Sequence, residues 1–377
     1  MEPDKYQDFL AGFPSTAESP AACSSGCCCG TKSSVNLNAP YITGTVQSGA
    51  GIVPKIATAL KPRDYFGAWK VRWGIGRMSY RVEPGLYAVG SPNGNSPVLV
   101  SANYKLTFDS LRKELAGLHV WLLILDTKGV NVWCAAGKGT FGTKELLKRI
   151  DAVSLSKVVT HRTLILPQLG ATGVAAHEIA KESGFHVVYG PVRACDIKAF
   201  LAAEMKATPQ MREVKFTIAD RIVLTPVDLV QSFKPFFLFL GVLFLLNAVG
   251  IGKFGFMEFA GFFGAIAAGC VFTPILLPWI PGRAFAFKGA LLGVIWAIAV
   301  IFLFGGFGAI GLLKTISFFL LLPSVSAYMA MNFTGSSTFT SPTGVNKEMR
   351  IAIPVMILAS VLGIVLLLAD SIIKMLQ

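Results

Sequence analysis

Hydrophobic and polar positions follow two different patterns along this chain. From about residue 41 to 230, short apolar runs typical of strands alternate with amphipathic runs typical of helices, and charged residues are frequent. From about residue 235 onward, long apolar stretches follow one another with few charges. The first pattern predicts an α/β domain with a mostly parallel sheet. The second predicts an all-α transmembrane domain, because a membrane-spanning helix needs about 20 apolar residues.

The α/β pattern predicts four strand and helix pairs. The expected strands are Pro97–Ser101, Val120–Leu125, Thr163–Pro167 and Phe185–Tyr189, and the expected helices are Phe108–Leu118, Thr143–Val153, Gly173–Glu182 and Ala194–Glu204. Ligands of such Rossmann-like sheets bind at the carboxyl ends of the strands. The loops expected there are 101–105, 127–138, 168–173 and 190–193, and glycines in the last two allow close backbone approach to a ligand.

The apolar half predicts about five membrane helices, at roughly 235–252, 256–280, 284–308, 309–332 and 351–373. The first is short, and Pro274, Pro278 and Pro323 are expected to bend or end helices. The placement of lysine and arginine between the stretches predicts a multi-pass protein of the inner (cytoplasmic) membrane, with its N-terminal domain in the cytoplasm. Membrane lipid is therefore an expected partner.

Polar and small residues within these stretches suggest packing rather than transport. Gly261, Ala265 and Gly269 recur every four residues, which favours close helix contacts. Lys288 and Lys314 lie near the ends of stretches, where long side chains reach the membrane surface. Because Glu258 and Asp370 also lie near ends, we expect no buried charge relay.

Composition supports this division. Hydrophobic residues make up 53% of the 377 residues and charged residues only 15%, too apolar for one ordinary soluble domain. The net charge of +13 suits anionic lipid, and no aromatic and basic motif of a nucleic-acid-binding module is present, so we expect no nucleic-acid partner. The polar N-terminus predicts no signal peptide. We therefore expect a flexible tail at 1–40, a cytoplasmic domain at 41–230 and a transmembrane domain at 231–377.

The seven cysteines do not form the pattern of a disulfide framework, and a reducing compartment suits them better. Four of them, Cys23, Cys27, Cys28 and Cys29, lie within seven residues of the tail. They could bind mercury or another soft metal, or they could be incidental thiols. Cys195 and Cys270 are expected to be small buried hydrophobic residues.

The remaining cysteine lies in the segment Asn-Val-Trp-Cys-Ala-Ala-Gly-Lys, residues 131–138, just after an expected strand. Small residues beside Cys134 would let a large flat cofactor approach its sulfur, and Asn131 and Thr140 could tie the segment to nearby backbone. A nucleophilic role needs a partner base, and the four scattered histidines give no sign of one. A role as metal ligand stays open, and a single protein ligand suits a metal already held by a macrocycle.

These residues carry a family resemblance. The segment 131–138 resembles the signature of the membrane-bound corrinoid proteins of mercury-methylating anaerobes, and the five apolar stretches match the layout of that family. Residues 99–109, 125–142 and 168–173 also resemble the corrinoid domain of the corrinoid iron–sulfur protein large subunit. The resemblance covers about residues 50–230.

The resemblance implies a function and a set of site residues. It implies a cobalamin-type corrinoid whose cobalt takes Cys134 as its lower axial ligand, and a methyltransferase that passes a methyl group from cobalt to mercury(II). It further implies a dicluster ferredoxin as electron donor and a methylated folate, or its methyltransferase, as methyl source. The residues expected to bind the corrinoid are Asn131, Val132, Trp133, Cys134, Ala135, Ala136, Gly137, Lys138, Thr140, Gln168, Gly170, Thr172, Gly173 and Gly190.

Other functions compete with this interpretation. The chain could carry methyl groups on a corrinoid to an acceptor other than mercury. It could be a membrane transporter with a cytosolic regulatory domain, although ionisable residues deep in the apolar stretches are lacking. A cysteine-nucleophile enzyme without corrinoid is weakened by the missing base.

Overall fold

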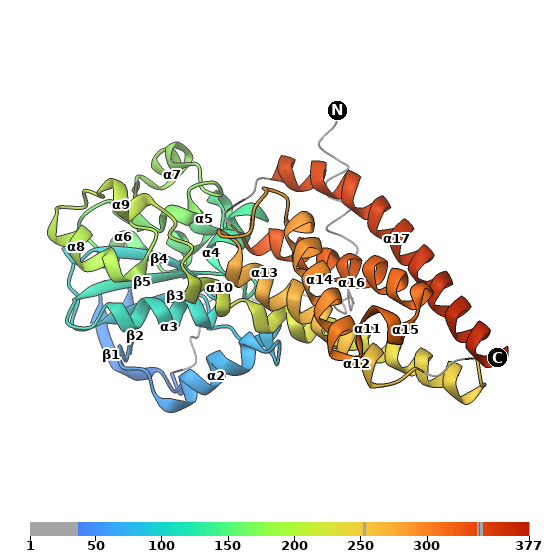
Figure 1. Ribbon diagram of the computed structural model, residues 1–377. Coiled ribbons are helices and arrows are strands. Elements are labelled where there is room, and N and C mark those ends of the chain that lie inside the picture. Colours follow the sequence, from blue (N-terminus) through green and yellow to red (C-terminus); the bar gives the residue numbers. More distant parts are fainter. Residues whose placement is uncertain (1–36, 252–253, 338, 340–341, 377) are drawn as a thin grey trace, which may run out of the picture. The chain divides into compact units, whose positions relative to one another are not determined.

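A computed structural model describes residues 37–251, 254–337, 339 and 342–376 (Figure 1). Residues 37–217 form an α/β region, and the rest of the described chain is helical. The cysteines at positions 23, 27, 28 and 29 lie outside the described residues, so their expected metal binding stays a prediction.

The α/β region is built on a seven-stranded sheet with the order β1-β2-β3-β5-β4-β6-β7 (Figure 1). Its parallel core, β5-β4-β6-β7, confirms the expected mostly parallel sheet. A hairpin, β1-β2, and an antiparallel strand, β3, extend one edge and were not predicted. The strands are β1 Ile42–Ser48, β2 Gly51–Ile56, β3 Gly85–Val89, β4 Val98–Ala102, β5 Val120–Leu125, β6 Thr163–Leu166 and β7 His186–Tyr189.

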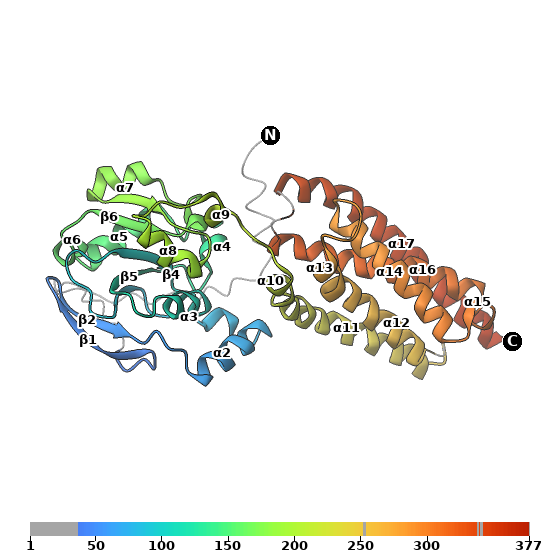
Figure 2. The same cartoon turned by 60° about the vertical axis from the view of Figure 1, so that its left-hand side comes forward.

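Helices cover both faces of the sheet. They are α2 Pro62–Arg72, η1 Arg77–Ser79, α3 Lys105–Glu114, α4 Val132–Gly137, α5 Thr143–Ala152, α6 Leu155–Val158, η2 Gln168–Gly170, α7 Ala176–Ser183, η3 Ala194–Asp196, α8 Ile197–Ala202 and α9 Pro209–Arg212. Figure 2 shows α5, α6 and α7 on one side of the sheet and α3 on the other. Strand β5 serves both sides: Trp121 and Leu123 belong to the core under α5, whereas Leu122 and Ile124 belong to the core under α3.

Three of the expected helices have other bounds in the structure, and one of them, α7, begins at Ala176 rather than Gly173. Helix α3 begins at Lys105 rather than Phe108 and ends at Glu114. The expected helix Ala194–Glu204 is a 3₁₀ turn followed by the short α8, which ends before Glu204 and Met205 because both adopt left-handed backbone conformations. Gly184, with φ 71°, ends α7 as expected.

The helical region contains five helices long and apolar enough to cross a membrane, which span 218–248, 256–276, 285–303, 312–335 and 343–374. The first is longer than expected and begins earlier, because the polar positions before Pro235 continue the helix. Residues 268–272 form a π-helical turn ahead of Pro274. The elements are α10 Ile218–Ile222, α11 Thr225–Ala248, α12 Phe256–Ala267, η4 Ala268–Phe272, α13 Thr273–Leu276, α14 Phe285–Leu303, α15 Gly306–Ile310, α16 Leu312–Asn332, η5 Phe333–Ser336 and α17 Pro342–Leu376.

Small residues bring these helices together, as expected from their spacing. A Cβ atom on Gly269 would lie 2.5 Å from the carbonyl oxygen of Ser326, and one on Gly293 would lie 2.5 Å from the Cα of Pro323. Such distances admit only glycine, so α14 and the π turn lie in close backbone contact with α16.

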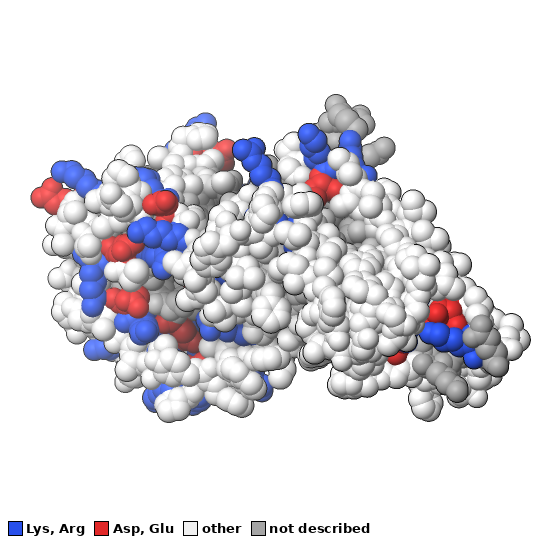
Figure 3. Space-filling model, in the orientation of Figure 1, with Lys and Arg blue, Asp and Glu red and all other residues white. Residues whose placement is uncertain are grey.

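Charged side chains gather over the α/β region, whereas the helical region presents a mostly uncharged surface (Figure 3). The helical region does bury some charge. Glu258 is 1% exposed and forms an ion pair with Lys314, and buried Lys288 donates to the carbonyl oxygen of Leu277. Lys288 is thus buried rather than extended to a surface, whereas the Lys314 side chain is 17% exposed and its expected reach to the membrane surface stays a prediction.

Candidate cofactor site

A pocket of about 430 Å³ opens at the carboxyl ends of β4 and β6. These two strands are neighbours, but the helices that follow them, α3 and α7, cover opposite faces of the sheet. Such a topological switch point leaves a crevice between the diverging connections, which is where open α/β sheets bind ligands. The pocket thus follows from strand order.

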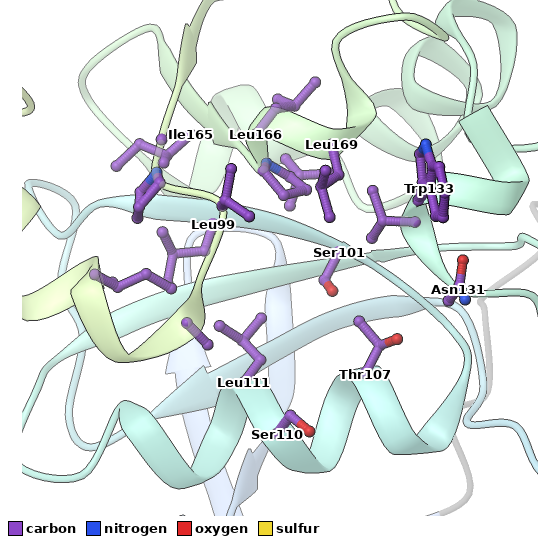
Figure 4. Close-up of a pocket in the computed structure, with 18 of the residues that line it drawn as sticks. Leu99, Ser101, Thr107, Ser110, Leu111, Asn131, Trp133, Ile165, Leu166 and Leu169 are labelled. Carbon is purple, nitrogen blue, oxygen red and sulfur yellow. The ribbon is translucent and has the colours of Figure 1, made fainter. Parts of the chain in front are cut away.

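The pocket has apolar walls and a few polar groups (Figure 4). Trp133 and Asn131 lie at one end, and Ile165 and Leu99 lie toward the other (Figure 4). The lining residues are Leu99, Val100, Ser101, Tyr104, Leu106, Thr107, Ser110, Leu111, Asn131, Val132, Trp133, Ile165, Leu166, Pro167, Leu169, Gly190, Pro191, Val192, Ala194 and Ile197. A mostly apolar pocket with a few oriented polar groups is typical of a small-molecule or cofactor site.

The short helix α4 presents the conspicuous cysteine. Its residues divide by exposure: Val132, Ala135 and Ala136 are buried against the sheet, while Trp133, Cys134, Gly137 and Lys138 at its C-terminal end are exposed. The exposed positions recur one helical turn apart, so they form one outward surface. We call Trp133, Cys134, Gly137 and Lys138 the outer face of α4.

Asn131 sets the start of α4. Its side-chain oxygen accepts a hydrogen bond of 2.9 Å from the backbone N–H of Cys134, an N-cap of the kind that contributes about 1 kcal/mol. Thr140 lies after the helix, and its hydroxyl donates weakly, at 3.4 Å, to the carbonyl oxygen of Ala135. Both residues tie the segment to its own backbone, as the sequence suggested.

The loop before α4 is held by Asn103, which the sequence analysis did not single out. Asn103 is 1% exposed, and its side-chain oxygen accepts hydrogen bonds from the backbone N–H groups of Thr127 and Gly129, at 3.1 and 3.0 Å. Its amide donates to Asp126 at 3.1 Å. Because Lys128 adopts φ 59° in this loop, a strained turn is fixed by a buried side chain.

Charge around this loop is partly compensated. Burial raises the pKa of Asp126, but hydrogen bonds from the side chain and backbone of Lys128, its positive charge and the bond from Asn103 outweigh burial and bring that pKa below its usual value. Asp126 therefore stays ionised and keeps accepting from Asn103. Its pairing with exposed Lys128, at 2.6 Å, does not reach the outer face of α4.

Tyr104 lies in the pocket wall, within electrostatic reach of Cys134. Burial raises the pKa of the Tyr104 phenol, against the positive charges of Arg77 and Arg72, and negative charge on Cys134 acts in the same direction as burial. Tyr104 lines the pocket, and so does Trp133, the neighbour of Cys134. The thiol thus lies beside the pocket without lining it.

Glycines near α4 fall into two kinds. A Cβ on Gly173 would lie 2.1 Å from the carbonyl oxygen of Phe141, and one on Gly170 would lie 2.5 Å from the Phe141 ring. Those two glycines are required by packing. A Cβ on Gly137 would meet nothing within 4 Å, and its backbone is not left-handed. Packing among the described residues therefore gives no reason for glycine at 137.

The structure brings together only part of the predicted binding set. Asn131, Val132, Trp133 and Gly190 line the pocket. Gln168 accepts a hydrogen bond from Arg212 at 2.7 Å. The other predicted residues lie outside the pocket: Cys134, Gly137 and Lys138 on the outer face of α4, Ala135 and Ala136 in the core, Gly170 and Gly173 in packing contacts, Thr140 half-buried, and Thr172 exposed.

The pocket also contains residues that the sequence analysis missed. Thr107, Ser110 and Leu111 come from α3, and the first was expected to precede the helix. Their spacing of three and four residues places them on one helix face. A helix start set at Lys105 would have revealed that face, and residues 99–109 already carried part of the resemblance.

The histidines offer no partner to Cys134. His119 precedes β5 and accepts a hydrogen bond from the backbone of Ser91, at 2.9 Å. His161 precedes β6 and is 2.9 Å from the carbonyl oxygen of Ser96. His186 begins β7, and His177 is exposed on α7. Three of the four thus lie at the amino ends of strands, the edge opposite the pocket.

The other described cysteines differ from each other. Cys270 is 1% exposed, which confirms the expected burial. Cys195 is exposed, so the expectation of burial was wrong there; it lies in the 3₁₀ turn η3 instead of within a regular helix. Within the described parts of the chain, no three His, Cys, Asp or Glu residues gather as a metal-ligand group.

Comparisons with known proteins show which proteins the α/β region is similar to in sequence. Residues 75–201 match the family of the CO dehydrogenase/acetyl-CoA synthase delta subunit. The acetyl-CoA decarbonylase/synthase complex subunit gamma of Archaeoglobus fulgidus is 33% identical over 127 residues, which cover 33% of this chain and 27% of that protein. The corrinoid/iron-sulfur protein large subunit of Moorella thermoacetica is also 33% identical over 127 residues, covering 33% and 28%. The chain thus spans about a quarter of these relatives' length, and the family match, over residues 75–201, includes α4 and the residues that line the pocket.

Proposed function

We propose that the α/β region binds a cobalamin-type corrinoid and that Cys134 is the lower axial ligand of its cobalt. The observation that carries the proposal is the outer face of α4, where an exposed thiol stands beside a glycine that packing does not require. Similarity over 127 residues to a protein named for its corrinoid supports it.

The donor set suits a metal that brings most of its own ligands. Cys134 is the single thiol on the outer face of α4, and the described residues contain no multi-ligand His, Cys, Asp or Glu group. A macrocycle is too large for the pocket but could lie over an exposed flat surface, where a thiolate is a fitting soft ligand. Gly137 leaves room beside the thiol on that surface, because nothing lies within 4 Å of the place its Cβ would take.

The pocket suits the other part of a cobalamin, the flat heteroaromatic base on its flexible tail. Its volume of about 430 Å³ lies in the range of small-molecule pockets. The side chains of Leu99, Leu111 and Ile165 offer apolar contact, and the hydroxyls of Thr107 and Ser110 offer hydrogen bonds. We propose that these residues hold the base while the outer face of α4 meets the ring.

In this mechanism the chain's own residues hold the cofactor in position and set the electronic properties of its metal. When bound, the corrinoid would supply the cobalt-carried methyl group. Cys134 would donate electron density to the metal, since an axial ligand sets the properties of a cofactor's metal. Asn131 and Asn103 fix the backbone that presents Cys134, and the neutral Tyr104 phenol adds no charge beside it. Lys138 places a positive charge one turn from the thiolate.

We further propose that the methyl acceptor is mercury(II) and the product methylmercury. The resemblance of residues 131–138 to the mercury-methylating corrinoid proteins supports this acceptor. A dicluster ferredoxin would then supply electrons, and a methylated folate or its methyltransferase would supply the methyl group. The five long apolar helices would anchor the chain in the inner membrane, with the α/β region in the cytoplasm.

A second candidate is a corrinoid methyl carrier for another acceptor. The similarity to subunits of the acetyl-CoA decarbonylase/synthase complex favours it, because those relatives are not named for mercury. The binding site would be the same in both cases, and only the acceptor would differ.

The absorption spectrum of the full chain, purified without oxygen, tests the proposal. We expect a corrinoid spectrum that changes in Cys134→Ala as thiolate ligation is lost, while Cys195→Ala, another exposed cysteine, leaves it unchanged. A colourless protein that takes up no added cobalamin would overturn corrinoid binding. An unchanged spectrum in Cys134→Ala would overturn the ligand role, and corrinoid-loaded protein that forms no methylmercury would point to the second candidate.

A further inference from the structure

The helical region contains a second cavity, of about 180 Å³, between α11, the π turn η4 and α16. It has no part in the proposed corrinoid site. Its lining is polar and sulfur-bearing in a region that is otherwise apolar, and consists of Asp228, Gln231, Ser232, Pro235, Cys270, Tyr328, Met329 and Asn332.

Two sulfur atoms converge on one hydroxyl in this cavity. The Oγ of Ser232 lies 3.3 Å from the Sγ of Cys270 and 3.2 Å from the Sδ of Met329. Ser232 also donates to the carbonyl oxygen of Asp228 at 2.8 Å. Because a hydroxyl has a single proton, it cannot satisfy both that carbonyl and the thioether. Even where the hydroxyl donates to the thioether, that sulfur has a second lone pair for another ligand.

The backbone brings these sulfurs together by an uncommon device. Cys270 lies in the middle of the π turn, and single π turns inside helices are frequent at functional sites. A Cβ on Gly269 would lie 2.5 Å from the Cβ of Met329, so only glycine lets the π turn come this close to α16. The hydroxyl of Thr273 donates to the Ala268 carbonyl at 2.8 Å, which satisfies a carbonyl within the π turn.

We infer that Cys270 and Met329 bind a single soft, thiophilic cation, with the Asp228 carboxylate as the compensating charge. Thiolate and thioether sulfur are the ligands that soft metal ions select. One thiolate and one carboxylate balance a divalent cation, and neither lysine nor arginine lines the cavity. Binding forms a metal–sulfur bond at Cys270 and releases its thiol proton to the buffer. The inference does not depend on corrinoid binding at Cys134.

The test uses the full chain in detergent with Hg²⁺ as the probe. A parent variant keeps Cys270 as the only thiol, through serine replacements at Cys23, Cys27, Cys28, Cys29, Cys134 and Cys195. Mercury retained per chain is measured after washing with a competing monothiol, and X-ray absorption counts the sulfur atoms around the bound ion. Three further replacements on this parent are Cys270→Ala, Met329→Leu and the matched control Met331→Leu, a buried methionine of α16 outside the cavity.

We expect one mercury per parent chain, with two sulfur ligands, and none in Cys270→Ala. Met329→Leu should bind at least about tenfold more weakly against the monothiol, as loss of a supporting metal contact does, while Met331→Leu should match the parent. A parent that retains no mercury would overturn the inference. A single sulfur ligand in the parent would also overturn it, and that measurement needs no replacement within the cavity. So would equal affinity in Met329→Leu, because Cys270 would then be an isolated thiol.

Discussion

Cys134 and Cys270 show how differently one side chain can be used within this protein. Cys134 is exposed on a six-residue helix, and the hydrogen bonds around it hold its backbone rather than its sulfur. Cys270 is buried, with the hydroxyl of Ser232 at 3.3 Å from its sulfur. A large planar ligand could reach only the first, whereas a bare ion could be held by the second. Exposure therefore selects the size of the ligand for each thiol.

Glycines sharpen the same contrast. Beside Cys270, the space that a side chain on Gly269 would need is occupied by atoms of α16, so this glycine lets two helices come together. Beside Cys134, Gly137 faces open space. Gly137 therefore leaves room on the outer face of α4, whereas Gly269 brings helices into contact, and this difference leads to the predictions that follow.

The largest expected effect is that of Cys134→Ala on activity. Methylmercury formation should fall at least about 100-fold, the upper range for changes around a bound metal, because no other described residue of the outer face can replace the thiolate. The free energy of unfolding should change by no more than about 0.5 kcal/mol, since the side chain is exposed. Methyl-transfer assays and thermal unfolding measure the two.

The control is Cys195→Ala, which should alter neither quantity. Full mercury methylation by Cys134→Ala would remove the reason to treat this thiol differently from Cys195.

Gly173→Ala should act on the same site through stability. Its Cβ would lie 2.1 Å from the carbonyl oxygen of Phe141 and 3.2 Å from the Cβ of Ala136, so the loop after β6 and α4 must move apart. Overpacking of this kind costs about 1–3 kcal/mol. We expect a lower unfolding temperature together with weaker corrinoid binding. A stable Gly173→Ala protein with weakened binding would instead assign Gly173 to the cofactor.

Gly137→Leu should show the reverse. Leucine favours helix over glycine by up to about 1 kcal/mol, and nothing within 4 Å opposes its Cβ, so stability should hold or rise. Corrinoid affinity should fall at least about tenfold, or 1.4 kcal/mol, because the side chain would project from the outer face of α4. Cobalamin titration measures it, with Gly44→Leu, another glycine facing open space, as control. Unchanged affinity would mean that the ring does not approach this face.

The sequence predicted the parts of this protein that repeat a pattern. Strand β5 has the expected bounds, Val120–Leu125, because a buried run of apolar residues is unambiguous. The antiparallel strand β3 and the hairpin β1-β2 were missed, since their pairing partners are set by tertiary contacts. The buried pair of Glu258 and Lys314 was missed for the same reason: position near a helix end says nothing of the neighbouring helix.

The site was predictable to a similar degree. The segment 131–138 and the carboxyl edge of the sheet were identified from residue types and their order. The α3 wall of the pocket was not, because it depends on where that helix begins. Asn103 was not identified either. It follows β4 and holds the loop after β5, and that loop lies beside Asn103 only when β4 and β5 are paired. The packing role of Gly170 and Gly173 was not predicted for the same reason, because the atoms that leave no room for a Cβ there come close only in the folded chain.

The smallest expected effect concerns acid and the loop that presents Cys134. The pKa of Asp126 is lowered in the folded protein: burial raises it, but the hydrogen bonds and charge of Lys128 outweigh burial. A carboxyl group of this kind stabilises the fold fully above its unfolded pKa of about 3.9 and loses that contribution as the pH falls through its lower folded value. Asp126→Asn should therefore cost less than about 1 kcal/mol at neutral pH, because the pair with Lys128 is largely exposed. The cost should shrink as the pH falls below about 3.9 and through the lower folded pKa, which unfolding temperatures at neutral and acidic pH would show. The pocket walls and the cavity at Cys270 should be unaffected, since Asp126 lines neither. A cost that does not shrink at all in acid would mean that Asp126 acts through its shape and its bond from Asn103 rather than its charge, and the presentation of Cys134 would then be independent of pH.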